Sequence, residues 1–171
     1  RDPTYERSST AHTNSCMRQQ FSSELNIRIS QFAAEFVRNF REHMGGDPAV
    51  PDLNVHHFGY MYLADSETLA SRLRDSYAVQ AGCGAATKLM SPDEIAAAYP
   101  FYQLDDIVLG SHNIIDEGYF DGATMFDWWR RKARQRGVCY IANEVVDVTC
   151  DAGRVISVTL ASGTVIGAGT V

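Results

Sequence analysis

The sequence predicts an α+β fold, and three observations predict it. Apolar residues recur at three- and four-residue spacing early in the chain, which is typical of an amphipathic helix. Signals for helix starts and ends punctuate the middle of the chain. The last third changes to short strand-like runs separated by tight turns. The expected order is therefore helix, strand, helix, helix, strand, helix and a β-meander.

The first predicted helix runs from Glu24 to His43, and Gly45-Gly46 ends it. Its apolar side chains form one stripe that we expect to face the core. The stripe consists of Leu25, Ile29, Phe32, Ala33, Phe36, Val37 and Phe40. Residues 1–23 are polar and rich in Ser and Thr, so we expect an extended surface loop there.

A strand is expected from His56 to Ala64, where aromatic residues are dense. Ser66 is expected to cap a helix from Glu67 to about Ala81. Ser91 gives a stronger start signal, because its hydroxyl can accept from the Glu94 amide while the Glu94 side chain reaches back. The helix that it begins is short and ends before Pro100.

Asp106 to Leu109 is expected to be a short strand, and Gly110 to Phe120 a loop. Asp121 can cap a helix from Gly122 to Arg136, whose basic last turns suit the helix macrodipole. Its inward-packing residues are expected to be Met125, Trp128, Trp129 and Ala133. The strand candidates that follow are Val138–Ile141, Val145–Cys150, Arg154–Leu160 and Thr164–Ala168.

The composition describes one soluble globular domain or a large piece of one, with 171 residues, 45% hydrophobic and 21% charged. With 15 basic and 21 acidic residues, the chain lacks the clustered cations that a nucleic-acid partner needs, apart from Arg130–Arg136. No apolar run approaches the roughly 20 residues of a membrane span. The four cysteines are widely spaced, so we expect a reduced cytoplasmic protein with no metal site.

Residue chemistry alone gives few candidates for a functional site. Arg18 could bind a carboxylate through two parallel hydrogen bonds, although an isolated arginine is more often a surface residue. Tyr60 and Tyr62 share one strand face with Phe58. These three aromatic residues could be part of the core, or they could form a wall of a substrate site. The acid pairs Asp105-Asp106 and Asp116-Glu117 are interpreted as caps and solvated loop charges, so no catalytic residue is assigned.

The order of four segments resembles the FAD-dependent oxidoreductases of the D-amino-acid oxidase, glycine oxidase and sarcosine oxidase superfamily. The similarity covers nearly all 171 residues. The segments are Arg1-Asp2-Pro3 with Ser9-Thr10 to Phe21, Leu89 to Ile95, Asp116 to Gly122, and Arg131 to Val138.

The resemblance implies part of a glutathione-reductase-type FAD-binding domain with a β-meander, interleaved with an antiparallel-sheet substrate domain. A full-length parent would be α/β. Residues 1–50 would belong to the FAD-binding domain, residues 51–120 to the substrate domain, and residues 121–171 to the FAD-binding domain again.

The resemblance also implies residues that contact FAD. Arg1 would lie near the adenine, and Val146 would meet the adenine through its backbone. Ser9 and Thr10 would contact the pyrophosphate or ribitol side. Ser15, Cys16 and Met17 would pass beside the isoalloxazine, and many family members have Gly-Gly where this chain has Ser15-Cys16.

By the same resemblance, Arg18 would bind the substrate carboxylate. The implied reaction is hydride removal from the carbon next to the nitrogen of a small amino acid or secondary or tertiary amine. The chain contains Gly167-Ala-Gly169 but no complete dinucleotide fingerprint, so we expect this polypeptide alone to bind FAD weakly or not at all and to be inactive. The alternative is a non-catalytic α+β module that binds a ligand or partner.

Overall fold

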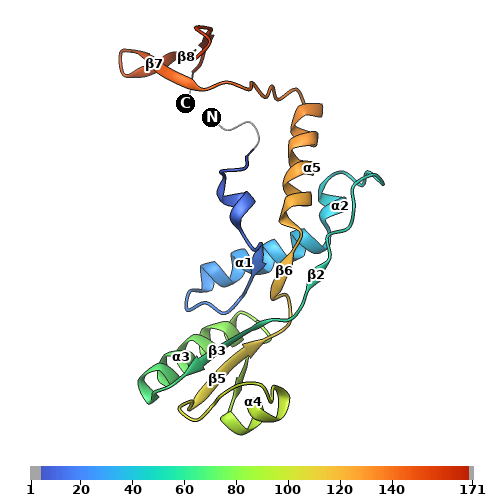
Figure 1. Cartoon of the computed structure of the whole chain (residues 1–171), viewed down its shortest axis with the longest axis vertical. Helices are drawn as coiled ribbons and strands as arrows, with labels where there is room; N and C mark the ends of the chain where they lie inside the picture. Colours follow the sequence, from blue (N-terminus) through green and yellow to red (C-terminus); the bar gives the residue numbers. More distant parts are fainter. Residues whose placement is uncertain (1–4, 170–171) are drawn as a thin grey trace. The chain divides into compact units, whose positions relative to one another are not determined.

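The structure is a computed structural model that describes residues 5–169. It has the predicted mixed α and β content (Figure 1). The strands of residues 5–169 form three antiparallel sheets of three strands each. The chain divides into two compact units. Residues 14–128 form what we call the central unit, and residues 5–13 with 129–169 form the terminal unit.

The first helix of the central unit is interrupted. The predicted helix 24–43 is observed as α1 (Glu24–Arg38) and α2 (Phe40–His43), which Asn39 separates. The apolar stripe is only partly buried. Val37 and Phe40 are 3% and 1% exposed, whereas Leu25 and Phe32 remain 68% and 65% exposed. The expectation that the whole stripe faces the core is therefore wrong, because the face of α1 that packs inward carries Ile27, Ala34 and Val37. Leu25, Ile29 and Phe32 share another face of the helix, which stays exposed.

One sheet of the central unit has the strand order β1 (Cys16–Met17), β6 (Gly118–Phe120) and β2 (Val55–His56). Met17 pairs with Gly118 in this sheet, and its side chain enters the core below α1 and α2. The buried core consists of Met17, Ala34, Val37, Phe40, Val50 and Leu53. The expected loop over residues 1–23 thus contains β1, and it also contains a short 3-10 helix, η1 (Ser9–His12).

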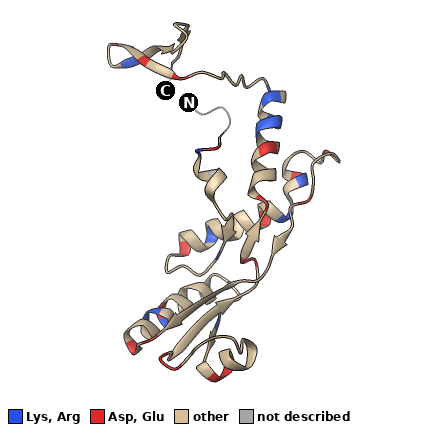
Figure 2. Cartoon of the chain, in the orientation of Figure 1, with Lys and Arg blue, Asp and Glu red and all other residues tan. Residues whose placement is uncertain are grey.

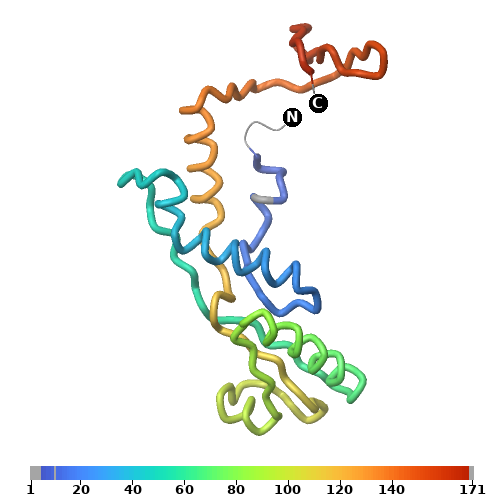
Figure 3. The backbone as a smooth tube through the Cα atoms, turned by 180° about the vertical axis from the view of Figure 1, so that it is seen from behind, coloured from blue at the N-terminus to red at the C-terminus, as the bar shows by residue number. Residues whose placement is uncertain are grey.

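The second sheet has the strand order β3 (Tyr60–Ala64), β5 (Leu109–Asn113) and β4 (Lys88–Met90). Helix α3 (Glu67–Gly82) packs against it, as Figures 1 and 3 show. The predicted loop 110–120 is wrong, since most of β5 and all of β6 lie there. The residues of β5 are mostly small or polar, so their sequence gave little sign of a central strand.

The predicted helix caps are confirmed. The Ser66 hydroxyl accepts a hydrogen bond from the Leu69 amide at the start of α3. Ser91 and Glu94 form the reciprocal capping box of α4 (Pro92–Ala98). Asp121 accepts from the Thr124 amide at 2.9 Å in the first turn of α5 (Gly122–Gln135). Met125 and Trp128 of α5 pack against the core, whereas Trp129 stays 43% exposed, contrary to expectation.

The terminal unit contains the predicted meander. Its strands are β7 (Val145–Asp151), β8 (Arg154–Leu160) and β9 (Val165–Gly167), in that order across the sheet. Ala152 and Gly153 both have positive φ, as a tight hairpin turn requires. The run 138–141 forms no strand. Across residues 5–169, no helix combines the length and apolar character of a membrane span.

Candidate functional site

Arg18 lies at the centre of an aromatic cluster in the central unit. Its Nη1 donates a hydrogen bond of 2.7 Å to the Tyr62 hydroxyl. The guanidinium carbon lies 4.7 Å from the centre of the Phe21 ring and 5.9 Å from that of Tyr62. Tyr60 stacks beside Tyr62, with 6.3 Å between ring centres. We call Arg18, Phe21, Tyr60 and Tyr62 the Arg18 cluster.

The charge of Arg18 is available for a ligand. Arg18 is exposed, and among the described residues no carboxylate forms an ion pair with it. A guanidinium offers five N–H donors, of which the bond to Tyr62 occupies one. The remaining donors can form the parallel pair that binds a carboxylate. The structure thus brings together all three residues that the sequence suggested for a substrate site.

The pKa of Tyr60, one of the two tyrosines of the cluster, is raised, so its hydroxyl is neutral at ordinary pH. Burial raises the pKa of Tyr60 to about 12, and a hydrogen bond with the Cys16 side chain adds to this effect. A neutral phenol can donate or accept a hydrogen bond without competing for the positive charge of Arg18. The cluster therefore presents the Arg18 cation beside the rings of Phe21, Tyr60 and Tyr62.

Glu117 is hydrogen-bonded to the two residues that follow Arg18, and its predicted role as a solvated loop charge is wrong. The side chain is fully buried, at 0% exposure. Its Oε1 accepts from the backbone amides of Gln19 and Gln20 at 2.6 and 3.1 Å and from Asn113 Nδ2 at 3.2 Å. Its Oε2 accepts from Gln20 Nε2 at 2.9 Å. No spacing in the sequence indicated this buried network, because its members come from distant segments.

The residues expected beside the isoalloxazine differ in what they expose. Ser15 has a φ of +48°, a backbone conformation that favours glycine, and the resemblance places Gly at this position in many relatives. The Ser15 side chain packs so closely that a Cβ added at Gly122 would overlap its hydroxyl. Cys16 is exposed, whereas the Met17 side chain is only 8% exposed and belongs to the core.

The other expected cofactor residues lie in the terminal unit or beyond the described chain. Ser9 is exposed in η1, which also contains Thr10. Val146 is 60% exposed on β7. Arg1 lies outside the described residues. These positions stay predictions.

A cleft of about 950 Å³ lies within the terminal unit. Arg130 lies over the Tyr5 ring at 5.0 Å, and Arg134 lies over the Tyr140 ring at 4.9 Å. The Nε of Arg130 is buried and has no hydrogen-bond partner among the described residues. The lining comprises Tyr5, Glu6, Arg7, Ser8, Arg130, Arg134, Tyr140, Ile141, Ala142 and Glu144.

The basic turns of α5 that form one wall of this cleft are visible in Figure 2. From the sequence we expected only a favourable helix end at these turns, and the cleft was not predicted. The available signal was the four-residue spacing of Arg130 and Arg134, which places both on one helix face. Cations next to aromatic rings suit a ligand that has both an anionic group and a flat ring.

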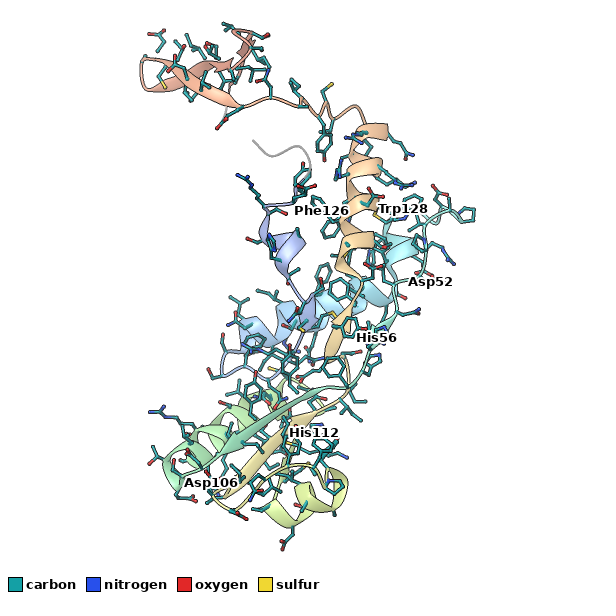
Figure 4. All side chains as sticks on the ribbon, viewed as in Figure 1. Asp52, His56, Asp106, His112, Phe126 and Trp128 are labelled. Carbon is teal, nitrogen blue, oxygen red and sulfur yellow. The ribbon has the colours of Figure 1, made fainter. Side chains whose placement is uncertain are left out.

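Histidines and acids do not gather into a metal centre in the part of the chain that the structure describes. Residues 5–169 contain no group of three His, Cys, Asp or Glu side chains placed to hold an ion. Figure 4 shows that His56 and His112 lie on separate strands of the central unit. His112 accepts or donates a 3.2 Å hydrogen bond with Tyr99, and burial lowers its pKa.

Solved structures define the class of fold. L-proline dehydrogenase from P. horikoshii is similar over 94% of this chain and 41% of its own, with a TM-score of 0.75 and 22% identity. Glycine oxidase from Geobacillus kaustophilus is similar over 94% of this chain and 43% of its own, with a TM-score of 0.70 and 16% identity. The chain therefore has the fold of part of an FAD-dependent oxidase.

Sequence comparisons define the family. The model of the family described as DAO, FAD dependent oxidoreductase, matches residues 1–171. FAD-dependent oxidoreductase domain-containing protein 1 of Xenopus laevis is 40% identical over 149 residues, which are 86% of this chain and 30% of the relative. The Drosophila melanogaster homolog is 34% identical over 170 residues, 99% of this chain and 32% of the relative. This chain belongs to the DAO family of FAD-dependent oxidoreductases, and it spans about a third of these relatives.

Proposed function

We propose that this chain is part of an FAD-dependent oxidoreductase that oxidises the C–N bond of a small amino acid or a secondary or tertiary amine. The observation that carries the proposal is the exposed guanidinium of Arg18, which is hydrogen-bonded to Tyr62 and forms no ion pair with residues 5–169. The similar solved structures include a proline dehydrogenase, a glycine oxidase and an L-amino acid deaminase, all named for substrates that carry a carboxylate.

In this proposal Arg18 binds the substrate carboxylate through its free donors. Tyr62 fixes the guanidinium by accepting one of its N–H groups, and Tyr60 extends the aromatic wall along β3. A fixed guanidinium orients its ligand more tightly than a flexible ammonium does, because its donors lie in one plane. The Arg18 cluster would thus orient the substrate and set its distance from the protein surface.

FAD is the cofactor that we propose, and the terminal-unit cleft fits part of it. The cleft offers cationic Arg130 and Arg134, two tyrosine rings, and a buried Arg130 N–H that has no acceptor among the described residues. These groups match a dinucleotide, which has a pyrophosphate and flat heterocycles. Within the terminal unit, further contacts would come from Ser9, Thr10 and the Val146 backbone. The contacts of Ser15 and Cys16 with FAD rest on the family resemblance alone. The chemistry that FAD supplies when bound is hydride acceptance, which would convert an amine into an imine.

This proposal assigns a function to each stretch of the chain. Residues 1–50 and 121–171 would serve the flavin, and residues 51–120 would serve the substrate. Support comes from the position of the cleft, which residues of the first and last stretches line. The tyrosine pair supports the second assignment, because β3 lies within residues 51–120.

Binding of FAD to the cleft can be tested with the 171-residue chain. Titration followed by FAD fluorescence is expected to show weak binding that Arg130→Met weakens about tenfold, since hydrogen bonds to charged groups contribute about 1.5–3 kcal/mol. The matched control is Arg131→Met, which removes the same charge from the neighbouring position of α5 but does not line the cleft. Equal losses in both variants would mean that FAD responds only to overall charge, and would contradict a specific site.

A further inference from the structure

Glu117 is the feature of the central unit that the proposed function leaves unused. Its carboxylate accepts the four hydrogen bonds described above and forms no ion pair within residues 5–169. Burial raises its pKa, whereas the bonds from Gln20, Gln19 and Asn113 oppose that rise. Burying a carboxylate that only amide groups stabilise costs folding free energy, so a role for it is expected.

The hydrogen bonds hold both the oxygen and the nitrogen of the Gln20 side-chain amide. Gln20 Oε1 accepts a 2.7 Å bond from the Ser111 hydroxyl, and Gln20 Nε2 donates to the carbonyl oxygen of Tyr60 at 3.0 Å. Ser111 lies on β5 and Tyr60 on β3, in the sheet that carries the tyrosine pair. The Gln20 side chain therefore connects that sheet to the segment that follows β1.

Arg18 is the residue directly before this anchored segment. The amides of Gln19 and Gln20 both point at Glu117 Oε1, so the backbone just after Arg18 has two fixed bonds. On the opposite side, Tyr62 lies two residues along β3 from the Tyr60 carbonyl that Gln20 holds. One carboxylate thus anchors both partners of the 2.7 Å bond between Arg18 and Tyr62.

We propose that Glu117 is a positioning residue that sets where the Arg18 guanidinium meets the tyrosine strand, and so determines the affinity for carboxylates. The link to substrates rests on the proposed function, whereas the positioning itself does not. Neutral Gln at this position would keep the size of the side chain. The NH₂ group of the new side chain would then face the NH₂ group of Gln20, and two donors cannot bond to each other. Otherwise Gln20 would have to rotate, which would break its bonds to Ser111 and Tyr60.

The positioning is tested by solution NMR of the 171-residue chain. We expect a nuclear Overhauser contact between the Arg18 guanidinium and the Tyr62 ring, and its loss in Glu117→Gln. The matched control is Glu94→Gln, which also neutralises a carboxylate that accepts a backbone amide bond, but on exposed α4. Persistence of the contact in Glu117→Gln, with unchanged Arg18 resonances, would overturn the proposal. Loss in both variants would overturn it as well.

The consequence for ligands is tested with benzoate, a flat carboxylate probe, in a double-mutant cycle. Glu117→Gln is expected to weaken benzoate binding at least tenfold in the wild-type background and less than twofold in the Arg18→Met background. Equal losses in both backgrounds would show that Glu117 acts on the fold at large, and would overturn the proposal. If Arg18→Met leaves benzoate affinity unchanged, the proposed function fails, and the NMR contact still decides the positioning role.

Discussion

Replacing Gly118 with alanine is expected to destabilise the central unit by about 3–5 kcal/mol, as backbone strain and steric overlap act together. Gly118 has a φ of +140°, which side chains rarely adopt, and an added Cβ would overlap the carbonyl oxygen of His56. Since Gly118 pairs with Met17 and follows Glu117, the change disturbs β1 and the segment that carries Arg18. Urea unfolding followed by circular dichroism measures the loss.

Gly84→Ala separates the two contributions. Gly84 has a φ of +75°, but an added Cβ would meet nothing within 4 Å. Only the conformational strain remains there, about 1–2 kcal/mol. If Gly118→Ala is no more destabilising than Gly84→Ala, β2 yields to the added methyl group, and the close packing of β6 against His56 is wrong.

Replacing Arg18 with methionine is expected to weaken benzoate binding by about tenfold to a hundredfold, since hydrogen bonds to charged groups contribute about 1.5–3 kcal/mol. The fold should be unaffected, because Arg18 is exposed and, among the described residues, the hydrogen bond of its side chain goes to Tyr62. Isothermal titration or chemical-shift titration measures the affinity.

Two comparisons make this result specific to a carboxylate. Benzamide has the same shape without the charge, and its affinity should change little between the wild type and Arg18→Met. Arg18→Lys keeps the charge but lacks the planar pair of donors, so an intermediate affinity is expected. If benzamide loses as much affinity as benzoate, Arg18 contributes by packing, and its assignment as the carboxylate-binding residue is wrong.

Local signals predicted the helices well, because a helix start depends on residues only three positions apart. Ser66, Ser91 and Asp121 all cap the helices expected of them. The short strands were harder to predict from the sequence. Strands β1 and β2 have two residues each, which is too short for a hydrophobic period to show. Each forms by pairing with β6, which lies far from it in the sequence.

The site was predictable in part for a similar reason. Arg18 and the tyrosine pair were suggested by their chemistry and by resemblance, and the contact between Arg18 and Tyr62 joins residues 44 positions apart. Glu117 could not be found this way, because its bonds to Gln19 and Gln20 span about a hundred residues. In the sequence it looks like an ordinary acid in a polar loop, and only the fold shows that it is buried.

The proposed function assigns to this chain the carboxylate-binding side of an amino-acid-oxidising flavoprotein. Its most direct test is a chimera in which the chain replaces the matching residues of the Xenopus laevis relative, to which it is 40% identical. The measurement is anaerobic bleaching of the long-wavelength flavin band by glycine, sarcosine, dimethylglycine and proline, and by their decarboxylated amines. The unmodified relative and the chimera with Arg18→Met serve as controls.

We predict that at least one amino acid bleaches the flavin, that its decarboxylated amine does so far more slowly, and that Arg18→Met removes the difference. A chimera that retains FAD but is bleached by none of these amino acids, or equally by both members of each pair, would contradict the claim.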